Sequence, residues 1–120
     1  MSDETTYRGG CHCGKVRFEV KMKPPEKAYA CNCSICSRAG WLLAFVGGDQ
    51  VTLTSGEDVL RDYQFGKRHI HHVFCAECGI RSFSRGTDRD GKPTWAVNLR
   101  CVEGIEAAEL PVETFDGKSL

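Results

Sequence analysis

The 120-residue sequence lacks the features that mark membrane, secreted and nucleic-acid-binding proteins. Its best apolar run, residues 39–46, falls far short of the roughly 20 residues that a membrane-spanning helix needs. The N-terminal segment Met-Ser-Asp-Glu-Thr-Thr has neither the basic nor the apolar region of a secretory signal. Lysine and arginine total 16, as do aspartate and glutamate, and a net charge of zero argues against a general nucleic-acid-binding protein. We therefore expect a cytoplasmic protein with neither a membrane nor a nucleic acid as its partner.

The sequence also has no stretch with the length and 3.6-residue period of a long helix, and no internal repeat. Apolar residues instead alternate with polar ones or form short runs, and turn signals separate them. These patterns predict strands at residues 16–22, 41–46, 51–54, 60–65, 70–74, 80–84 and 94–101. One helical turn is expected at residues 106–110. The chain, residues 1–120, is therefore expected to form a single all-β domain of about seven or eight short strands, with little helix.

Cysteine, in contrast, is abundant, and its spacing is the most informative feature of the chain. Seven of the 8 cysteines fall in three tight clusters, at residues 11–13, 31–36 and 75–78. Cysteines this close together suit a metal better than a disulfide, because a tetrahedral zinc holds its sulfurs roughly 3.8 Å apart. In a reducing cytosol, patterned cysteines indicate metal ligands. The sequence therefore predicts zinc as the cofactor, with two ions per chain.

Two of the clusters together supply four ligands, which complete a closed site of the structural kind. The ligands of this predicted structural zinc are Cys11, Cys13, Cys75 and Cys78. Gly14 and Gly79 follow the two pairs at matching positions. Glycine there lets backbone N–H groups turn toward the sulfurs without a clash of Cβ. One zinc would thus join two segments about sixty residues apart in the sequence.

The remaining cluster supplies only three ligands, Cys31, Cys33 and Cys36, which leaves one coordination position open, as in catalytic zinc sites. Zinc with three thiolates has a net negative charge, which weakens its Lewis acidity and suits it to a soft fourth ligand such as a substrate thiol. Two alternatives remain: a water that does nothing, or a histidine that makes the site purely structural. The histidines available for that role are His12, His69, His71 and His72.

Four further features have two interpretations each. Cys101 continues an apolar pattern, so we expect it to pack as a small hydrophobe. Arg38 could offset the negative charge of the second zinc site or be a solvated surface arginine. Trp41 could wall that site, although a place in the core is favoured. The stretch 67–72 is locally basic, but an ordinary solvated strand face is the favoured interpretation.

These motifs resemble the glutathione-dependent formaldehyde-activating enzyme family, also called the centromere protein V domain family. The resemblance covers residues 9–117. It rests on Gly-Gly-Cys-His-Cys-Gly-Lys-Val-Arg-Phe at residues 9–18, Cys-Asn-Cys-Ser-Ile-Cys at residues 31–36 and Phe-Cys-Ala-Glu-Cys-Gly at residues 74–79. Asn-Leu-Arg-Cys at residues 98–101 and Phe-Asp-Gly at residues 115–117 are also similar to family members.

The resemblance implies a β-tent fold and the same division of the cysteines into a structural and a catalytic zinc. It also implies a carbon–sulfur lyase that joins glutathione and formaldehyde to S-hydroxymethylglutathione. The second zinc would then have Cys31, Cys33 and Cys36 as ligands rather than as nucleophiles. The partner would be a small thiol such as glutathione. The alternative is a non-catalytic, zinc-stabilised binding module. A redox enzyme ranks third, because no α/β pattern follows either C-x-x-C motif.

Overall fold

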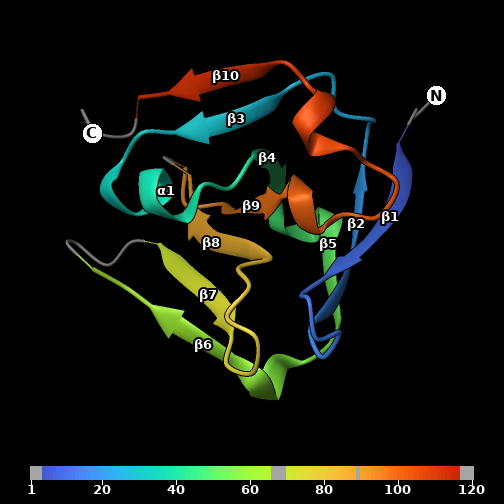
Figure 1. Cartoon of the computed structure of the whole chain (residues 1–120), viewed down its shortest axis with the longest axis vertical. Coiled ribbons are helices and arrows are strands. Elements are labelled where there is room, and N and C mark those ends of the chain that lie inside the picture. Colours follow the sequence, from blue (N-terminus) through green and yellow to red (C-terminus); the bar gives the residue numbers. More distant parts are fainter. Residues whose placement is uncertain (1–3, 66–69, 89, 117–120) are drawn as a thin grey trace.

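The computed structural model describes residues 4–65, 70–88 and 90–116, and these residues form a mostly β structure (Figure 1). Of these residues, 47% lie in strands and 17% in helical segments. The strands are β1 (Thr5–Gly10), β2 (Arg17–Met22), β3 (Ala28–Cys31), β4 (Leu43–Gly47), β5 (Val51–Ser55), β6 (Leu60–Tyr63), β7 (His71–Cys75), β8 (Phe83–Thr87), β9 (Pro93–Asn98) and β10 (Val112–Phe115). The single α-helix of these residues, α1, spans Ser34–Ala39, and short 3₁₀ helices lie at Gly48–Gln50, Glu57–Val59, Leu99–Cys101 and Ala107–Glu109. None of the helices described here is long and apolar enough to cross a membrane.

The predicted all-β fold is confirmed, but the predicted number of strands was too low. The described residues contain three strands that the sequence pattern did not indicate: β1, β3 and β10. Two of them are edge strands, and every residue of β10 is exposed. A strand with no buried face needs no alternation of apolar residues, so its pattern is lost. The predicted helical turn at residues 106–110 is present as the 3₁₀ helix Ala107–Glu109.

The strands form two sheets. The smaller sheet has the order β1-β2-β5 and is antiparallel. The larger has the order β10-β3-β4-β9-β8-β7-β6, and within it only the pair β10–β3 is parallel among the pairings described. Figure 1 shows β1, β2 and β5 on one side of the molecule, and β6, β7 and β8 on the other. The parallel pairing places Phe115 opposite Cys31, so the last strand lies beside the second cysteine cluster.

The main hydrophobic core contains residues of both sheets. In β2, Phe18, Val20 and Met22 are buried while Lys21 between them is exposed, as the period of two predicted. The Phe18 ring meets the ring of Phe83 in β8 edge to face, with centroids 5.8 Å apart. Burial of this apolar face therefore holds the smaller sheet against the larger one.

The strand predicted at residues 94–101 ends early. The side-chain oxygen of Asn98 accepts a hydrogen bond from the backbone N–H of Arg100 at 3.1 Å, which caps a 3₁₀ helix in place of continued strand. Leu99 remains buried, and Cys101 packs half-buried against the main core. The expectation that Cys101 packs as a hydrophobe is therefore confirmed, although it is not on the face of a strand.

Gly56 lies in the turn after β5, at the point where this turn packs against the loop that carries Cys13. Its φ is +92°, and a Cβ at this position would lie 2.3 Å from the carbonyl oxygen of Lys15. Ser55 Oγ also donates a hydrogen bond to that oxygen, at 3.1 Å. The absence of a side chain at Gly56 is thus needed both for the left-handed backbone and for the close approach of the two turns.

We expect Gly56→Ala to lower the free energy of unfolding by about 2–3 kcal/mol, because it combines a left-handed non-glycine residue with a steric clash. The matched control is Gly91→Ala. Gly91 has a φ of +80° but nothing within 4 Å of the added Cβ, so only the backbone cost should remain. Urea unfolding of the metal-saturated proteins measures both. Equal losses for the two variants would contradict the predicted clash.

Candidate metal centres and adjoining clefts

Two similar turns carry the predicted structural site. Cys11 follows β1 and Cys75 ends β7, and the carbonyl oxygen of each accepts a hydrogen bond from a glycine N–H in its own turn. These glycines, Gly14 and Gly79, have φ values of +83° and +79°, which residues with a Cβ rarely adopt. The matching glycines predicted from the sequence therefore close both turns.

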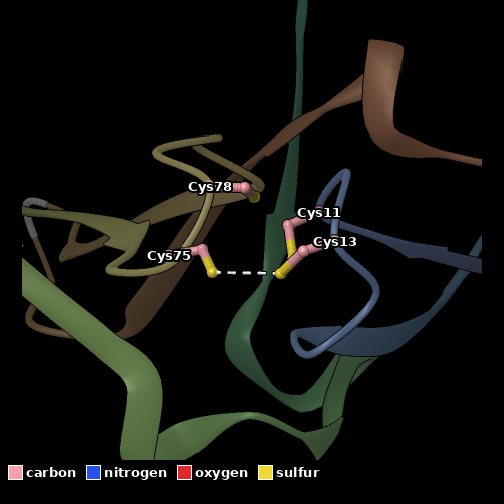
Figure 2. A group of neighbouring side chains, drawn as sticks. All are labelled: Cys11, Cys13, Cys75 and Cys78. Atoms are coloured by element: carbon pink, nitrogen blue, oxygen red, sulfur yellow. Dashed lines mark hydrogen bonds between the residues drawn. The ribbon is translucent and has the colours of Figure 1, made fainter.

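The turns bring four sulfurs into one group, as Figure 2 shows. All four Sγ atoms of Cys11, Cys13, Cys75 and Cys78 lie within 4.8 Å of one another. Cys13 Sγ is 3.5 Å from Cys11 Sγ and 3.6 Å from Cys75 Sγ. These distances are close to the roughly 3.8 Å expected between ligands of a tetrahedral zinc and far from a disulfide bond. The donor set therefore fits a metal ion.

Backbone donors stabilise negative charge in this group. Hydrogen bonds from the backbone N–H groups of Cys13 and Ile80 lower the pKa of Cys78 to about 6. A backbone hydrogen bond from Lys15 also favours the Cys13 thiolate, but desolvation and the neighbouring thiols outweigh it and raise the pKa of Cys13 to about 12. Burial raises the pKa of Cys11, but hydrogen bonds from the Val16 N–H and from neighbouring thiols more than offset it, so the net shift is downward. The group therefore favours thiolates at Cys11 and Cys78 and resists one at Cys13. A divalent cation would remove that resistance, because it binds thiolates.

The second group forms where β3 gives way to α1. Cys31 ends β3, Cys33 is the N-cap residue of α1, and Cys36 lies within the helix. Their three Sγ atoms lie within 4.8 Å of one another. The helix ends at Gly40, whose φ is +68° and whose N–H donates to the carbonyl oxygen of Cys36. A short helix therefore returns Cys36 to the other two cysteines.

The start of α1 favours a thiolate at Cys33. Burial raises the pKa of Cys33, but N–H groups of Cys36 and Ile35 and the two neighbouring thiols more than offset it, so the net shift is downward. Burial raises the pKa of Cys36, and the negative charges of Cys31 and Cys33 add to that effect. The group therefore holds its first negative charge at the N-terminal end of the helix.

The C-terminal strand braces this second group. Asn32, between two of the cysteines, donates from Nδ2 to Asp116 Oδ1 at 3.0 Å, and its backbone N–H donates to the carbonyl oxygen of Phe115. Sequence reasoning singled out Phe115 and Asp116 through the family resemblance, with no structural role. Their role is visible only when β10 lies parallel to β3.

Trp41 and Arg38 both adjoin the second group. Trp41 is only 3% exposed and forms a small core cluster with Leu43 and Ala96, against which Cys36 packs. It therefore belongs to the core and walls the cysteine group as well. Arg38 is exposed, and its Nη1 donates to the carbonyl oxygen of Ser34 at 2.8 Å.

The histidines of the described residues do not join either sulfur group. His71 Nδ1 lies 2.6 Å from an aspartate oxygen, and His72 Nδ1 lies 3.0 Å from the carbonyl oxygen of Tyr63. Burial lowers the pKa of His72, which favours the neutral ring. In the part of the chain that the structure covers, both candidate metal groups consist of cysteines alone, and His12 is absent from them. Residues 67–69, with His69 and half of the locally basic stretch 67–72, lie outside the described residues.

Two cavities adjoin these groups. The larger, about 790 Å³, borders Cys11 and extends to Trp41 and Arg100. None of the three cysteines of the second group lines either cavity. The smaller, about 530 Å³, is named here the α1 cleft. Its lining residues are Ser34, Ile35, Arg38, Ala39, Tyr63, Phe65 and Arg81. Arg81 lines both cavities. Sequence reasoning missed Tyr63, Phe65 and Arg81, because no local motif marks residues that only the fold brings to α1.

Fold and sites together define a cysteine-rich, all-β protein with two thiol groups that could hold metal ions. The sequence profile described as glutathione-dependent formaldehyde-activating enzyme matches residues 6–116, and the chain belongs to this family. The resemblance predicted from the motifs is thereby confirmed.

Two similar proteins support this assignment. A curated protein of Halomonas elongata, whose name assigns it provisionally to the glutathione-dependent formaldehyde-activating enzymes, is 32% identical over 82 residues. That match covers 58% of this chain and 50% of the relative, so the chain spans about half the length of the relative. A crystal structure of a Rhodobacter sphaeroides protein is similar with a TM-score of 0.76 and 33% identity, over 88% of this chain and 99% of that one.

Proposed function

We propose that the chain, as one domain of residues 1–120, is a zinc-dependent carbon–sulfur lyase acting on a small thiol adduct. The four-cysteine group would hold a structural zinc, and Cys31, Cys33 and Cys36 would hold a second zinc as ligands rather than as nucleophiles. All eight cysteines are free thiols, in keeping with a reducing, cytoplasmic setting. Membership of the family supports glutathione as the thiol and formaldehyde as the carbonyl partner.

The observation that carries this proposal is the unequal number of ligands in the two groups. Four cysteine sulfurs converge in one group and three in the other, and no fourth donor from the described residues joins the three. Closed sites are structural, whereas catalytic sites keep a position for substrate. A zinc ion on three thiolates would supply a soft position that favours a deprotonated thiol.

The reaction that follows is the addition of a thiol to an aldehyde. The thiolate sulfur forms a carbon–sulfur bond with the carbonyl carbon of formaldehyde, and the carbonyl oxygen takes up a proton to give the S-hydroxymethyl adduct. The reverse reaction breaks the same bond and releases both partners. In this proposal the backbone N–H groups at the start of α1 stabilise negative charge on Cys33.

Cobalt substitution tests the proposal directly, because cobalt takes the same ligands and its thiolate charge-transfer bands report the coordination of the ion. We expect glutathione at millimolar concentration to change these bands, with a signal proportional to one cobalt ion per chain. Bands that stay unchanged across that range would contradict an open, thiol-binding site and would favour the non-catalytic binding module instead.

A further inference from the structure

The α1 cleft carries positive charge that nothing in the described chain balances. Arg38 and Arg81 both line it, and no carboxylate is among its lining residues. Neither arginine takes part in any of the ion pairs that the described residues form. The whole chain has a net charge of zero, so two unpaired cations in one cleft are a local concentration of charge. Such a cleft attracts an anionic ligand.

Arg81 is held in place and partly removed from water. Its guanidinium Cζ lies 5.3 Å from the centroid of the Phe74 ring, a cation–π contact, and its backbone carbonyl accepts a hydrogen bond from Asn98 Nδ2 at 2.9 Å. Its Nη1 is buried and has no hydrogen-bond partner among the described residues. A charged donor in this state interacts more strongly with an approaching anion than one in open water does.

Two aromatic residues also line the cleft. Tyr63 and Phe65 stack with centroids 5.8 Å apart, and the Phe65 ring also stacks on His72 at 5.2 Å. Tyr63 remains 49% exposed and Phe65 39% exposed. These rings offer an apolar surface beside the two guanidinium groups, which suits a ligand with both an apolar stem and a carboxylate.

The cleft also begins beside the proposed substrate site. Ser34 and Ile35, which line it, directly follow Cys33 in the sequence, and Arg38 lies one turn further along α1. A six-residue helix is about 9 Å long, and a tripeptide spans about 10 Å when extended. Figure 1 shows α1 on the same side of the molecule as the end of β6, and residues of both elements line the cleft. A peptide-sized thiol could therefore reach from the cysteine group into the cleft.

We infer that the α1 cleft binds a carboxylate of the thiol substrate, with Arg81 and Arg38 as its partners and Tyr63 and Phe65 as an apolar wall. This inference rests on the proposed function and narrows it to thiols that carry a carboxylate about one residue from the sulfur. Arg81 and Arg38 are then residues that determine specificity, because they contact the part of the substrate that does not react.

The test uses two thiols with the same reactive sulfur: glutathione and its diethyl ester, in which both carboxylates are replaced by uncharged ethyl esters. Each is titrated into the cobalt-substituted protein, and the change in the charge-transfer bands yields a Kd. We expect the ester to bind the original chain about 10- to 100-fold more weakly than glutathione does, as loss of a charge-assisted hydrogen bond implies.

Variants assign that preference to the cleft. Arg81→Gln and Arg38→Gln should each weaken glutathione binding about tenfold and leave ester binding unchanged. Arg38 is exposed, so its variant keeps the test available if Arg81→Gln does not fold. The control is Arg61→Gln, since Arg61 donates to the backbone carbonyls of Asp58 and Leu60 and does not line the cleft. It should leave both Kd values unchanged.

The outcomes separate the two proposals. Equal Kd values for glutathione and its ester, with no effect of either cleft variant, would overturn the carboxylate site while leaving thiol coordination intact. A loss of affinity for both thiols in the cleft variants would overturn it too, because it would indicate a structural role for the arginines. If neither thiol changes the bands of the original chain, the proposed function fails, and the carboxylate site fails with it.

Discussion

Cys75→Ser is expected to abolish cooperative folding and to remove one of the two metal ions proposed for this chain. Cys75 is fully buried at the end of β7, and its sulfur lies among the four that form the closed group. The free energy of metal binding to such a group contributes directly to folding, and it is about 10–16 kcal/mol in small zinc domains. A typical domain has only about 5–15 kcal/mol of stability in total. Even a partial loss should therefore leave little folded protein.

Metal analysis of the purified protein and thermal unfolding followed by circular dichroism measure this effect. The matched control is Cys101→Ser, which also removes a thiol that packs against the core but belongs to neither metal group. We expect Cys101→Ser to keep both ions and to lose about 1 kcal/mol of stability. If Cys75→Ser kept the full metal content and the original melting temperature, the closed group would not be a structural metal site.

Cys33→Ser is expected to have the opposite combination of effects: an intact fold and lost catalysis. Cys33 is the N-cap residue of α1 and makes no side-chain capping hydrogen bond, whereas serine is among the preferred N-cap residues. The helix should therefore keep or gain stability. The substitution removes one of only three sulfurs in the open group, so the second metal ion should be lost. A metal ion stabilises the charge of a transition state by several kcal/mol, and losing that stabilisation corresponds to a fall in rate of about 100-fold or more.

The rate is measured by NMR as exchange between free glutathione and its S-hydroxymethyl adduct, above the spontaneous exchange without protein. Metal content and the melting temperature are recorded on the same samples. Ser37→Ala is the control, because Ser37 lies in the same helix but contributes to neither the cysteine group nor the α1 cleft. Full turnover by Cys33→Ser would show that the open group is not the catalytic site.

The cysteine groups and the all-β class could be predicted because both depend on local spacing. Ligands two or three residues apart converge in any turn that closes, and the glycines behind them indicate such turns. The period of two at residues 16–22 likewise predicts a half-buried strand, which is β2. The strands β1 and β10 escaped prediction because neither has a buried face: Gly9 is the one fully buried residue of β1, and every residue of β10 is exposed. A strand without a buried face requires no alternation of apolar and polar residues.

Local spacing was thus enough to find which thiols gather, to divide them four to three, and to recognise the family. The folded chain was needed to show what surrounds them. Arg81 and Arg38 share one cleft although 43 positions separate them in the sequence, and Asp116 bonds to Asn32 across 84 positions. Such contacts follow from how sheets pair and pack over the whole molecule. Because no local propensity encodes that pairing, the surroundings of the open cysteine group, and with them the specificity for substrate, depend on the tertiary structure.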